Sequence, residues 1–447
     1  MKKIYRQLLL FSSSVVFMAI APLLIFYAMG YRVGISDGDT LPVGVLIVET
    51  NPRRASISID GKVIGDTPYS ISNLPPGEVM VSLSHDGYIT WLKRLLIEST
   101  VVSELRDVRL FPAEPKTTTI FSRPDSFSLS PNRQLLAIIT PNRELHIIDE
   151  EALPVIAPIK IRFVPTRLLW SPDSSRVLLI DDKAVSFVNI TDRTPLDRPL
   201  SALKQTRQIT WDLRIPGRLL AINNANELIA YNIATNASVK LAEKVHTFAT
   251  SSRHIYVVEQ KSQQIQVYNL QGQQIATISP AADQIIDQLF ATPGGHMAIE
   301  FTDTSLAVLD EGGQLLPVAD RTLHTGWSPN GQILYVQTDE TSVHVYNALD
   351  ERLSYVPMKQ LHLVLRLSRP IRSPQWFAGG HHLIYQADDE IVITEIDTRD
   401  HPISYTVDST NLGDSLVTVG QEGDNIFYIK NTPAGTQLVT TSLVIEE

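Results

Sequence analysis

The sequence predicts an all-β chain, in which a ring of repeated four-stranded sheets follows a small β domain and one apolar N-terminal helix. Three observations support this prediction. An apolar residue before a polar turn, often a tryptophan, recurs at regular intervals after residue 121. Short runs of alternating apolar and polar residues fill the segment 41–112. The segment 1–30 contains a long apolar stretch without charge.

Length, charge and cysteine usage exclude several classes of function before any motif is considered. The chain has 447 residues, a net charge of −10 and no cysteine. Such a length needs several domains or a repeat array. The negative charge argues against nucleic acid as a partner, because phosphates are neutralised by lysine and arginine. The absence of cysteine excludes disulfides, thiolate metal ligands and a cysteine nucleophile.

Residues 1–30 are predicted to form a cytoplasmic stub and a transmembrane signal anchor. Three cationic residues among the first six precede Leu8–Ala28, a run of 21 residues without charge. At a rise of 1.5 Å per residue, a helix of this length spans about 30 Å, enough to cross a bilayer core. The basic flank favours a cytoplasmic N-terminus and an exported remainder. The other interpretation is a cleaved signal peptide, for which Ala19-Ile20-Ala21 offers a small-x-small site.

Residues 31–40 are predicted to be a linker rich in Gly and Asp, and residues 41–112 a small β domain. Asp60-Gly61 is a hairpin signal between two alternating runs. Pro75-Pro76-Gly77 predicts a tight turn, because proline presets the turn and glycine accepts positive φ. Strands are expected at 43–50, 55–60, 62–65, 78–84, 88–91, 93–97 and 108–111.

The order of turns in this domain matches a known family. The matching motifs are Asn51-Pro52, Ala55, Ile59-Asp60-Gly61, Gly65-Asp66-Thr67-Pro68, Leu74-Pro75-Pro76-Gly77, and Gly87-Tyr88 followed by Trp91. With these motifs, residues 43–98 resemble the PEGA domain, although the tetrapeptide Pro-Glu-Gly-Ala is altered here to Pro-Pro-Gly-Glu. The resemblance implies a β-sandwich-like extracytoplasmic module without catalytic residues. It suggests cell wall or polysaccharide as a partner. We expect the side chains of Tyr88 and Trp91 to pack within the domain.

Residues 113–447 are predicted to form a β-propeller. The residues before the repeated turn are Leu129, Trp170, Trp211, Phe248, Phe290, Trp327 and Trp376, at intervals of 37 to 49 residues. Three short strands accompany each copy, and a period near 40 with this content is typical of propeller blades. The turns Ser171-Pro-Asp and Ser328-Pro-Asn after tryptophan resemble WD-repeat-like units of bacterial periplasmic propellers. The resemblance implies the fold and leaves the function open.

The ends of each copy predict how the sheets continue and how the ring closes. Third strands end in Asp or Asn, whose side chains cap local backbone groups at a turn. The fourth strands have weak patterns, as expected for exposed outer strands. Residues Gln437–Val444 are predicted to close the ring by pairing with Lys116–Phe121. Eight copies are visible, but one of them is degraded, so the sequence leaves seven or eight blades open.

A search for chemistry yields no catalytic, cofactor-binding or metal-ligating residues. The sequence has no Gly-x-Ser-x-Gly elbow and no His-Glu-x-x-His motif. Its histidines are scattered, and the adjacent pair His381-His382 points to opposite faces of a strand. Acidic pairs such as Asp181-Asp182 lack the spacing of a calcium loop. The repeated tryptophans are therefore interpreted as packing residues rather than as a ligand cage.

One local basic cluster, Arg366, Arg369 and Arg372, is a candidate binding loop. It lies in the longest insertion, Leu353–Ser373, between the sixth and seventh copies. Loops on a rigid scaffold are common places for binding. The alternative is that the cluster belongs to a solvent-exposed connecting loop without a binding role.

These features predict a single-pass protein of the bacterial cell membrane whose C-terminal domains are extracytoplasmic. The expected role is non-catalytic binding or scaffolding, with propeller loops presented to an envelope protein or cell-wall glycan. The alternative is a propeller enzyme, a hydrolase or lyase acting on glycan through acidic residues at the ring axis. A sensor that signals inward is disfavoured, because only about six residues precede the membrane segment.

Overall fold

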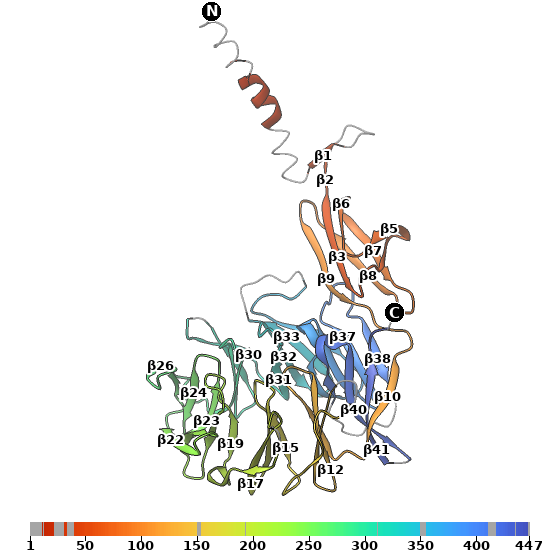
Figure 1. The fold of residues 1–447 in the computed structure, drawn as a ribbon. Helices are drawn as coiled ribbons and strands as arrows, with labels where there is room; N and C mark the ends of the chain where they lie inside the picture. The colour runs from red at the N-terminus through yellow and green to blue at the C-terminus, as the bar shows by residue number, and fades with distance from the viewer. Residues whose placement is uncertain are drawn as a thin grey trace, which may run out of the picture. The chain divides into compact units, whose positions relative to one another are not determined.

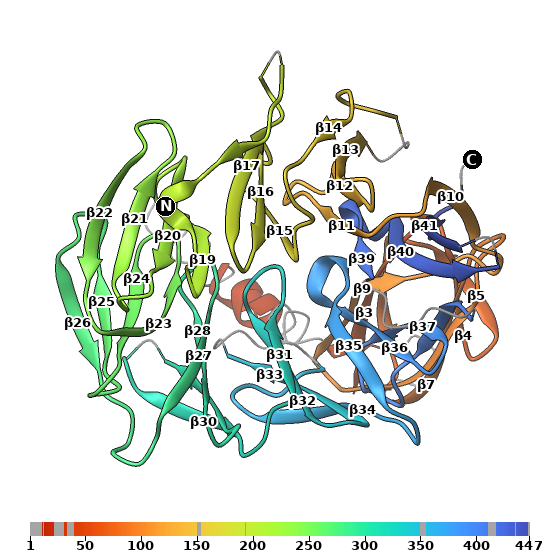
Figure 2. The same ribbon diagram turned by 90° about the horizontal axis from the view of Figure 1, so that it is seen from below.

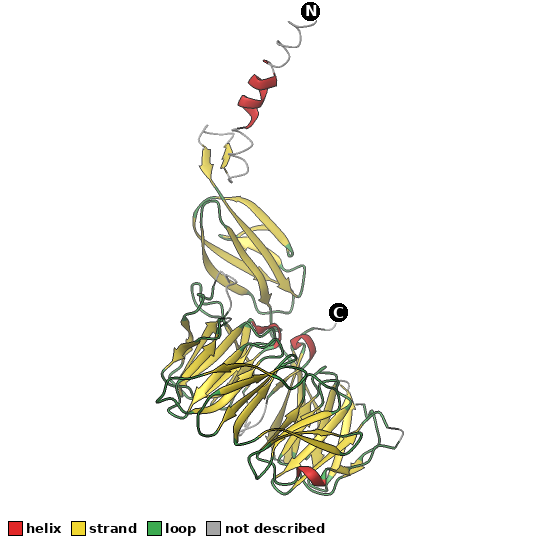
Figure 3. Cartoon of the chain, turned by 90° about the vertical axis from the view of Figure 1, so that its left-hand side faces the viewer, coloured by secondary structure: helices red, strands yellow, loops and turns green. Residues whose placement is uncertain are grey.

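The computed structural model describes residues 11, 13–21, 31–33, 40–149, 153–192, 194–310, 312–348, 355–409, 417–433 and 435–445. Strands dominate these residues, as Figure 3 shows. The chain divides into two compact units. The first comprises residues 1–114, 399–401 and 445–447, and the second comprises 115–398 and 402–444.

The N-terminal segment is described only in part. Residues 11 and 13–21 are helical. Residues 1–10 and 22–30, which belong to the predicted stub and anchor, lie outside the described residues. Within the described residues, no helix has both the length and the apolar character needed to cross a membrane.

The predicted linker has a short ladder at its described ends. Strands β1 (Tyr31–Val33) and β2 (Thr40–Pro42) pair antiparallel, with Tyr31 opposite Pro42. No strand was predicted at Tyr31, so this ladder differs from the expected irregular linker. Residues 34–39 lie outside the described part.

The small β domain consists of two sheets (Figure 1). One sheet has the order β6-β3-β9, and the other has the order β5-β4-β7-β8. Their strands are β3 (Gly44–Asn51), β4 (Ser56–Ile59), β5 (Lys62–Asp66), β6 (Tyr69–Leu74), β7 (Gly77–Ser84), β8 (Trp91–Ile97) and β9 (Val102–Arg109). Buried and more exposed residues alternate along β3, β7 and β8, so each sheet turns one apolar face to the core. The expected hairpin at Asp60-Gly61 is confirmed by the pairing of β4 with β5.

Three features of this domain differ from the sequence prediction. The last strand spans Val102–Arg109, where 108–111 was expected, and it runs parallel to β3. Its pattern misled the prediction because β9 is an edge strand with few buried positions. Strand β6 was not predicted at all. The strand expected at 88–91 does not form, because Tyr88 makes only an isolated bridge to Pro112 and β8 begins at Trp91.

The expected packing role of Trp91 is confirmed, because its side chain is buried. Two residues further along the same face of β8, Lys93 is fully buried as well. The Lys93 ammonium lies 5.5 Å from the centroid of the Trp91 ring. A cation over an aromatic face is attracted by the ring quadrupole, so this contact offsets part of the cost of burying the charge.

The second unit is a series of four-stranded antiparallel sheets arranged around an axis, as Figure 2 shows. The first strand of each sheet lies nearest the axis, and these strands are β11 (Ser126–Leu129), β15 (Arg167–Trp170), β19 (Gln208–Trp211), β23 (Val245–Thr250), β27 (Ile286–Ala291), β31 (His324–Trp327), β35 (Ile371–Trp376) and β39 (Thr418–Val419). The second strands are β12 (Leu135–Thr140), β16 (Arg176–Asp181), β20 (Arg218–Ile222), β24 (Ile255–Glu259), β28 (Met297–Phe301), β32 (Ile333–Asp339), β36 (His382–Ala387) and β40 (Asn425–Thr432).

The outer half of each sheet follows the predicted order. The third strands are β13 (Glu144–Asp149), β17 (Ala184–Asn189), β21 (Leu228–Asn232), β25 (Ile265–Tyr268), β29 (Leu306–Leu309), β33 (Ser342–Asn347), β37 (Glu390–Glu395) and β41 (Gly435–Ser442). The fourth strands are β14 (Ile159–Lys160), β18 (Arg198–Pro199), β22 (Ala237–Ala242), β26 (Gln274–Ile278), β30 (Leu315–Ala319), β34 (Leu361–Arg366), β38 (Ser404–Asp408) and β10 (Lys116–Ser122). Short 3-10 turns occupy Ser201–Leu203, Ala378–Gly380 and Gln421–Gly423.

The ring closes as predicted, because the first strand of the second unit completes its last sheet. Strand β10 pairs antiparallel with β41, with Lys116 opposite Ser442 and Ser122 opposite Gln437. The same sheet continues through β40 to β39. One sheet thus joins strands from both ends of this unit, which leaves no open gap in the ring.

The core lies between neighbouring sheets. One cluster of buried residues joins Ala137 and Ile139 of β12 to Val177 and Leu179 of β16. Equivalent clusters join β16 to β20, and β28 to β32. Each sheet therefore buries both of its faces against its neighbours, which a single isolated sheet could not do.

Candidate functional site

The polar turn between first and second strands has a common geometry where the sequence reads Ser-Pro-Asp or Ser-Pro-Asn. In the β15–β16 turn, Ser171 Oγ donates to Asp173 Oδ1 at 2.5 Å and accepts the Arg176 N–H at 2.9 Å. In the β31–β32 turn, Ser328 Oγ accepts the Ile333 N–H at 2.9 Å. The repeated serine therefore satisfies the backbone where the second strand begins, which is a structural role.

The tryptophans before these turns join neighbouring sheets. The indole nitrogens of Trp170, Trp211, Trp327 and Trp376 donate to the backbone oxygens of Ser128, Leu169, Phe290 and Gly326 at 3.2, 3.2, 2.9 and 2.8 Å. Each acceptor lies on the first strand of the preceding sheet. The predicted packing role of the tryptophans is thereby confirmed, with a hydrogen bond between sheets in addition.

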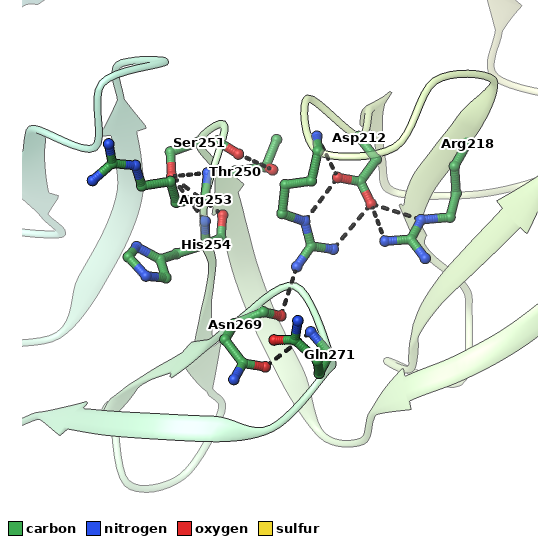
Figure 4. Close-up of polar contacts among 9 residues, drawn as sticks. Asp212, Arg218, Thr250, Ser251, Arg253, His254, Asn269 and Gln271 are labelled. Carbon is green, nitrogen blue, oxygen red and sulfur yellow. Dashed lines mark hydrogen bonds and ion pairs between the residues drawn. The ribbon is translucent and has the colours of Figure 1, made fainter.

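The β19–β20 turn departs from this pattern and builds a different site (Figure 4). It reads Asp212-Leu213-Arg214, so a carboxylate replaces the serine and a guanidinium replaces the Asp or Asn. Asp212 Oδ1 accepts Arg214 Nε at 2.8 Å, and Asp212 Oδ2 accepts Arg214 Nη2 at 2.9 Å. Arg218 Nε adds a bond of 2.7 Å to the same Oδ2. One carboxylate is thus held between two arginines.

This Asp212–Arg214–Arg218 triad is almost completely buried. The side chains of Asp212 and Arg214 are 0% and 2% exposed, and that of Arg218 is 20% exposed. Burial opposes ionisation of Asp212, but the hydrogen bonds from Arg214 and Arg218 outweigh it and lower the pKa of the carboxyl group below its usual value. The triad therefore carries two positive charges against one negative charge.

Arg214 also connects the triad to the neighbouring β23–β26 sheet. Its Nη1 donates to the backbone oxygen of Asn269 at 3.2 Å. Asn269 directly follows the third strand β25, and its Oδ1 accepts the Gln271 N–H at 3.0 Å, as expected for an asparagine that caps a turn. In the same sheet, the fully buried Ser251 takes the serine role, since its Oγ accepts the His254 N–H at 3.0 Å.

A pocket of about 120 Å³ lies between the β19–β22 and β23–β26 sheets, next to the triad. Arg214 and Arg218 line it together with aliphatic side chains that include Leu228 and Val257. The tip of the β25–β26 turn, Leu270–Gly272, forms another part of the lining. The pocket therefore combines apolar walls with a cationic group.

The three arginines of the candidate binding loop come from β34, from the connection that follows it and from β35. Arg366 ends β34 and donates from Nε to Ser342 Oγ at 3.1 Å. Arg369 forms ion pairs with Asp388 and Glu390, and Arg372 on β35 donates to the backbone oxygen of Asp388. The cluster is thus engaged with acidic and polar groups of the same unit. The preceding residues 353–354 of the insertion lie outside the described part.

The histidines do not gather into a site. His381 Nδ1 lies 2.7 Å from Tyr355 Oη, whereas the adjacent His382 is buried in β36. Burial, then the charge of Arg366, lowers the pKa of His344. Within the described ranges, no three His, Asp or Glu side chains form a group that could hold a metal ion.

Sequence reasoning missed the triad and its pocket. The only signal in the sequence was that Asp212 and Arg214 stand where other copies carry Ser and either Asp or Asn. Arg218 did not stand out, because the preceding sheet also has an arginine, Arg176, at the same place. There the arginine pairs only with the exposed Asp173. The pairing depends on burial, which the sequence pattern did not assign.

The comparisons with known proteins agree with both units. The PEGA domain family matches residues 43–106. No curated protein sequence matches the chain. The C-terminal WD40 domain of Sif2 is 12% identical, with a TM-score of 0.51 over 74% of this chain and 99% of that chain.

Two further solved structures have similar coverage. A structure described as the eukaryotic initiation factor is 10% identical, with a TM-score of 0.50 over 73% of this chain and 87% of that chain. The WD40 domain of SCAP from fission yeast is 10% identical, with a TM-score of 0.49 over 74% of this chain and 98% of that chain. At these identities the first two likenesses establish the fold alone. The chain thus contains a PEGA domain followed by a β-propeller of the WD40 type.

Proposed function

We propose that this chain is a non-catalytic binding or scaffold protein, anchored in the membrane of a bacterial cell by one helix and exposed to the cell envelope. A PEGA domain beside a WD40-type propeller supports a binding or scaffold role. We take the eight four-stranded sheets between Lys116 and Ser442 as eight blades. The apolar run Leu8–Ala28 after a basic flank supports the anchor.

The observation that carries the proposal is the use of polar side chains along the axis. Arg167 Nη2 donates to the Ile209 oxygen at 3.3 Å, and Gln208 Nε2 donates to the Phe248 oxygen at 2.8 Å. Gln375 Nε2 binds the backbone oxygen of Val417 in the same way, at 2.6 Å. These first-strand side chains connect one sheet to the next. An axis built from such contacts suits a rigid support, whose exposed loops then bind the partner.

The proposed partners are an envelope protein or cell-wall glycan. The loop that carries Arg366, Arg369 and Arg372 remains our candidate contact. Its ion pairs with Asp388 and Glu390 hold it in a defined shape, which lowers the entropy lost when a partner binds.

Co-sedimentation with isolated cell wall and cross-linking in intact envelopes test this proposal. The purified full chain should be retained by wall material. Alternatively, it should cross-link to a specific envelope protein, and added isolated cell wall should not compete for this contact. Arg372→Gln should weaken this retention, whereas Arg176→Gln in a distant sheet should not. Retention by neither material would contradict the proposal. Protease digestion of sealed cells tests the orientation, because only an exported propeller is cleaved from outside.

A glycan-active enzyme is the second candidate, because one pair of carboxyl groups fits it. Asp287 lies on the first strand β27, and Glu300 lies on the neighbouring strand β28. Burial, and then the negative charge of Asp287, raises the pKa of Glu300. A carboxyl group with a raised pKa beside a second carboxyl group is an arrangement that glycosidases use. Release of reducing sugar from cell-wall glycan, abolished in Glu300→Gln and Asp287→Asn, would favour this function over the scaffold.

A further inference from the structure

The pocket beside the Asp212–Arg214–Arg218 triad has an apolar interior. Leu228, Ile255 and Val257 line it, and all three are buried in the core between the two sheets. Leu241 and Ala242, at the end of the outer strand β22, complete the aliphatic wall and are only partly buried. The pocket therefore extends from the accessible edge of the ring toward the apolar core. A hydrocarbon group fits such walls, whereas a sugar would leave its hydroxyl groups without partners.

The polar end of this pocket carries an excess positive charge. Arg214 uses Nε and Nη2 on Asp212, and Nη1 on the Asn269 oxygen. Arg218 uses Nε and Nη2 on the same carboxylate. Among the described residues, Arg218 Nη1 has no hydrogen-bond partner, and no second carboxylate pairs with either arginine. Two guanidinium groups and one carboxylate leave one net positive charge. The free donor belongs to Arg218, whose side chain is 20% exposed.

We infer that the pocket binds a short aliphatic carboxylate. The carboxylate would accept hydrogen bonds from Arg218, whose planar guanidinium matches its geometry. It would also supply the second negative charge that the triad lacks. The hydrocarbon tail would lie against Leu228, Ile255 and Val257. At about 120 Å³ the pocket is comparable to an apolar cavity of about 150 Å³ that accommodates benzene, so the tail is short.

This inference does not depend on the partner proposed above. The pocket lies between the β19–β22 and β23–β26 sheets, whereas the candidate loop belongs to β34 and β35. Retention by cell wall and binding of a small acid therefore succeed or fail separately.

Calorimetric titration of the full chain with hexanoate tests the inference. Saturable binding with a stoichiometry near one is expected. Hexan-1-ol keeps the chain without the charge, and acetate keeps the charge without the chain, so both should bind about tenfold to a hundredfold more weakly. Equal affinity for hexanoate and hexan-1-ol would show that the arginines do not contribute to binding and would contradict the inference. An absence of saturable hexanoate binding would overturn it.

Three variants locate the site. Arg218→Gln should weaken hexanoate binding about tenfold or more, because it removes a charge-assisted donor. Arg176→Gln is the matched control, since Arg176 begins β16 as Arg218 begins β20, and it should leave binding unchanged. Ala242→Phe fills the pocket from the partly exposed edge without touching the triad, and it should also abolish binding. Unchanged affinity in a folded Ala242→Phe protein would place the ligand elsewhere.

Discussion

At the scale of single residues, the main feature of this protein is a buried carboxylate shared by two arginines. Removing charges from water costs several kcal/mol for each ion, and the attraction within the site repays this only when the geometry is good. Asp212 accepts two hydrogen bonds from the Arg214 side chain and one from Arg218 Nε within 2.9 Å, and Arg218 Nη2 lies 2.6 Å from the same Oδ2. The triad is therefore stable only as a whole, and the loss of one member leaves the others without compensation.

Replacement of Asp212 by Asn should lower the free energy of unfolding by about 3–5 kcal/mol, because two arginines then lose their only anion. Urea denaturation followed by tryptophan fluorescence measures the change. Asp173→Asn is the control, since that exposed residue pairs with Arg176 at 3.7 Å, and its loss should cost about 0–1 kcal/mol. Equal effects of the two substitutions would contradict the burial argument.

The lowered pKa of Asp212 predicts a dependence of stability on pH. A group whose folded-state pKa is depressed stabilises the fold above its unfolded pKa of about 3.9, and this stabilisation is lost as pH falls through the folded-state pKa. The difference in unfolding free energy between the wild type and Asp212→Asn should therefore be full at neutral pH and shrink below about pH 4. Urea titrations of both proteins at a series of pH values measure it. A difference that stays constant into strong acid would mean that the carboxyl group is not ionised in the folded protein.

At the scale of elements, four tryptophans join the first strands of neighbouring sheets by both packing and a polar contact. Trp170 is buried, and its indole donates to the Ser128 oxygen in the preceding sheet. This contact repeats at three other tryptophans of the ring. The hydrogen bond fixes the indole relative to the neighbouring strand. The contact therefore determines how the two sheets are aligned, in addition to stabilising their packing.

Trp170→Phe should reduce stability by about 1–3 kcal/mol, because the Ser128 oxygen loses its partner while most of the ring packing remains. Thermal and urea denaturation measure the loss. Tyr256→Phe serves for comparison, since it removes a longer bond of 3.4 Å to the Gly295 oxygen and should cost less than about 1 kcal/mol. If Trp170→Phe were as stable as the wild type, the indole bond would contribute nothing beyond packing.

At the scale of the whole molecule, the periodic features were predictable and the exceptions were not. Trp170 and Ser171 belong to a repeated motif, so their spacing alone indicated the strand order, the ring and the pairing of its ends. The apolar alternation around Asp60-Gly61 likewise indicated the first hairpin. Lys93 gave no such signal, because its burial follows from its place in an alternating strand rather than from its residue type.

The candidate site depends on a contact that sequence spacing does not encode. Arg214 reaches Asn269 in the next sheet, and this contact forms only because the ring places the two turns together. The exchange of serine for Asp212 marked the turn as different. Whether that turn lay in solvent or in a buried triad depended on the packing of the neighbouring sheet, which local patterns do not report.

Closure of the ring is the property of the whole second unit, and it depends on β41. Val439 is buried, and it lies between Thr119 of β10 and Tyr428 of β40. Proline there removes a backbone donor from a strand that has partners on both sides, a position that proline does not normally occupy. Val439→Pro should therefore lower the melting temperature of the ring and make its unfolding less cooperative, since the first and last sheets then separate.

Proline at an outer strand provides the matched comparison. Val239 lies on β22, which pairs with β21 and forms the edge of its sheet, and its side chain is exposed. Edge strands accept proline more readily, so Val239→Pro should shift the melting temperature less than Val439→Pro. Calorimetry of both variants decides the point. If the two substitutions had the same effect, β41 would behave as another edge strand, and the ring would not depend on the pairing of its two ends for stability.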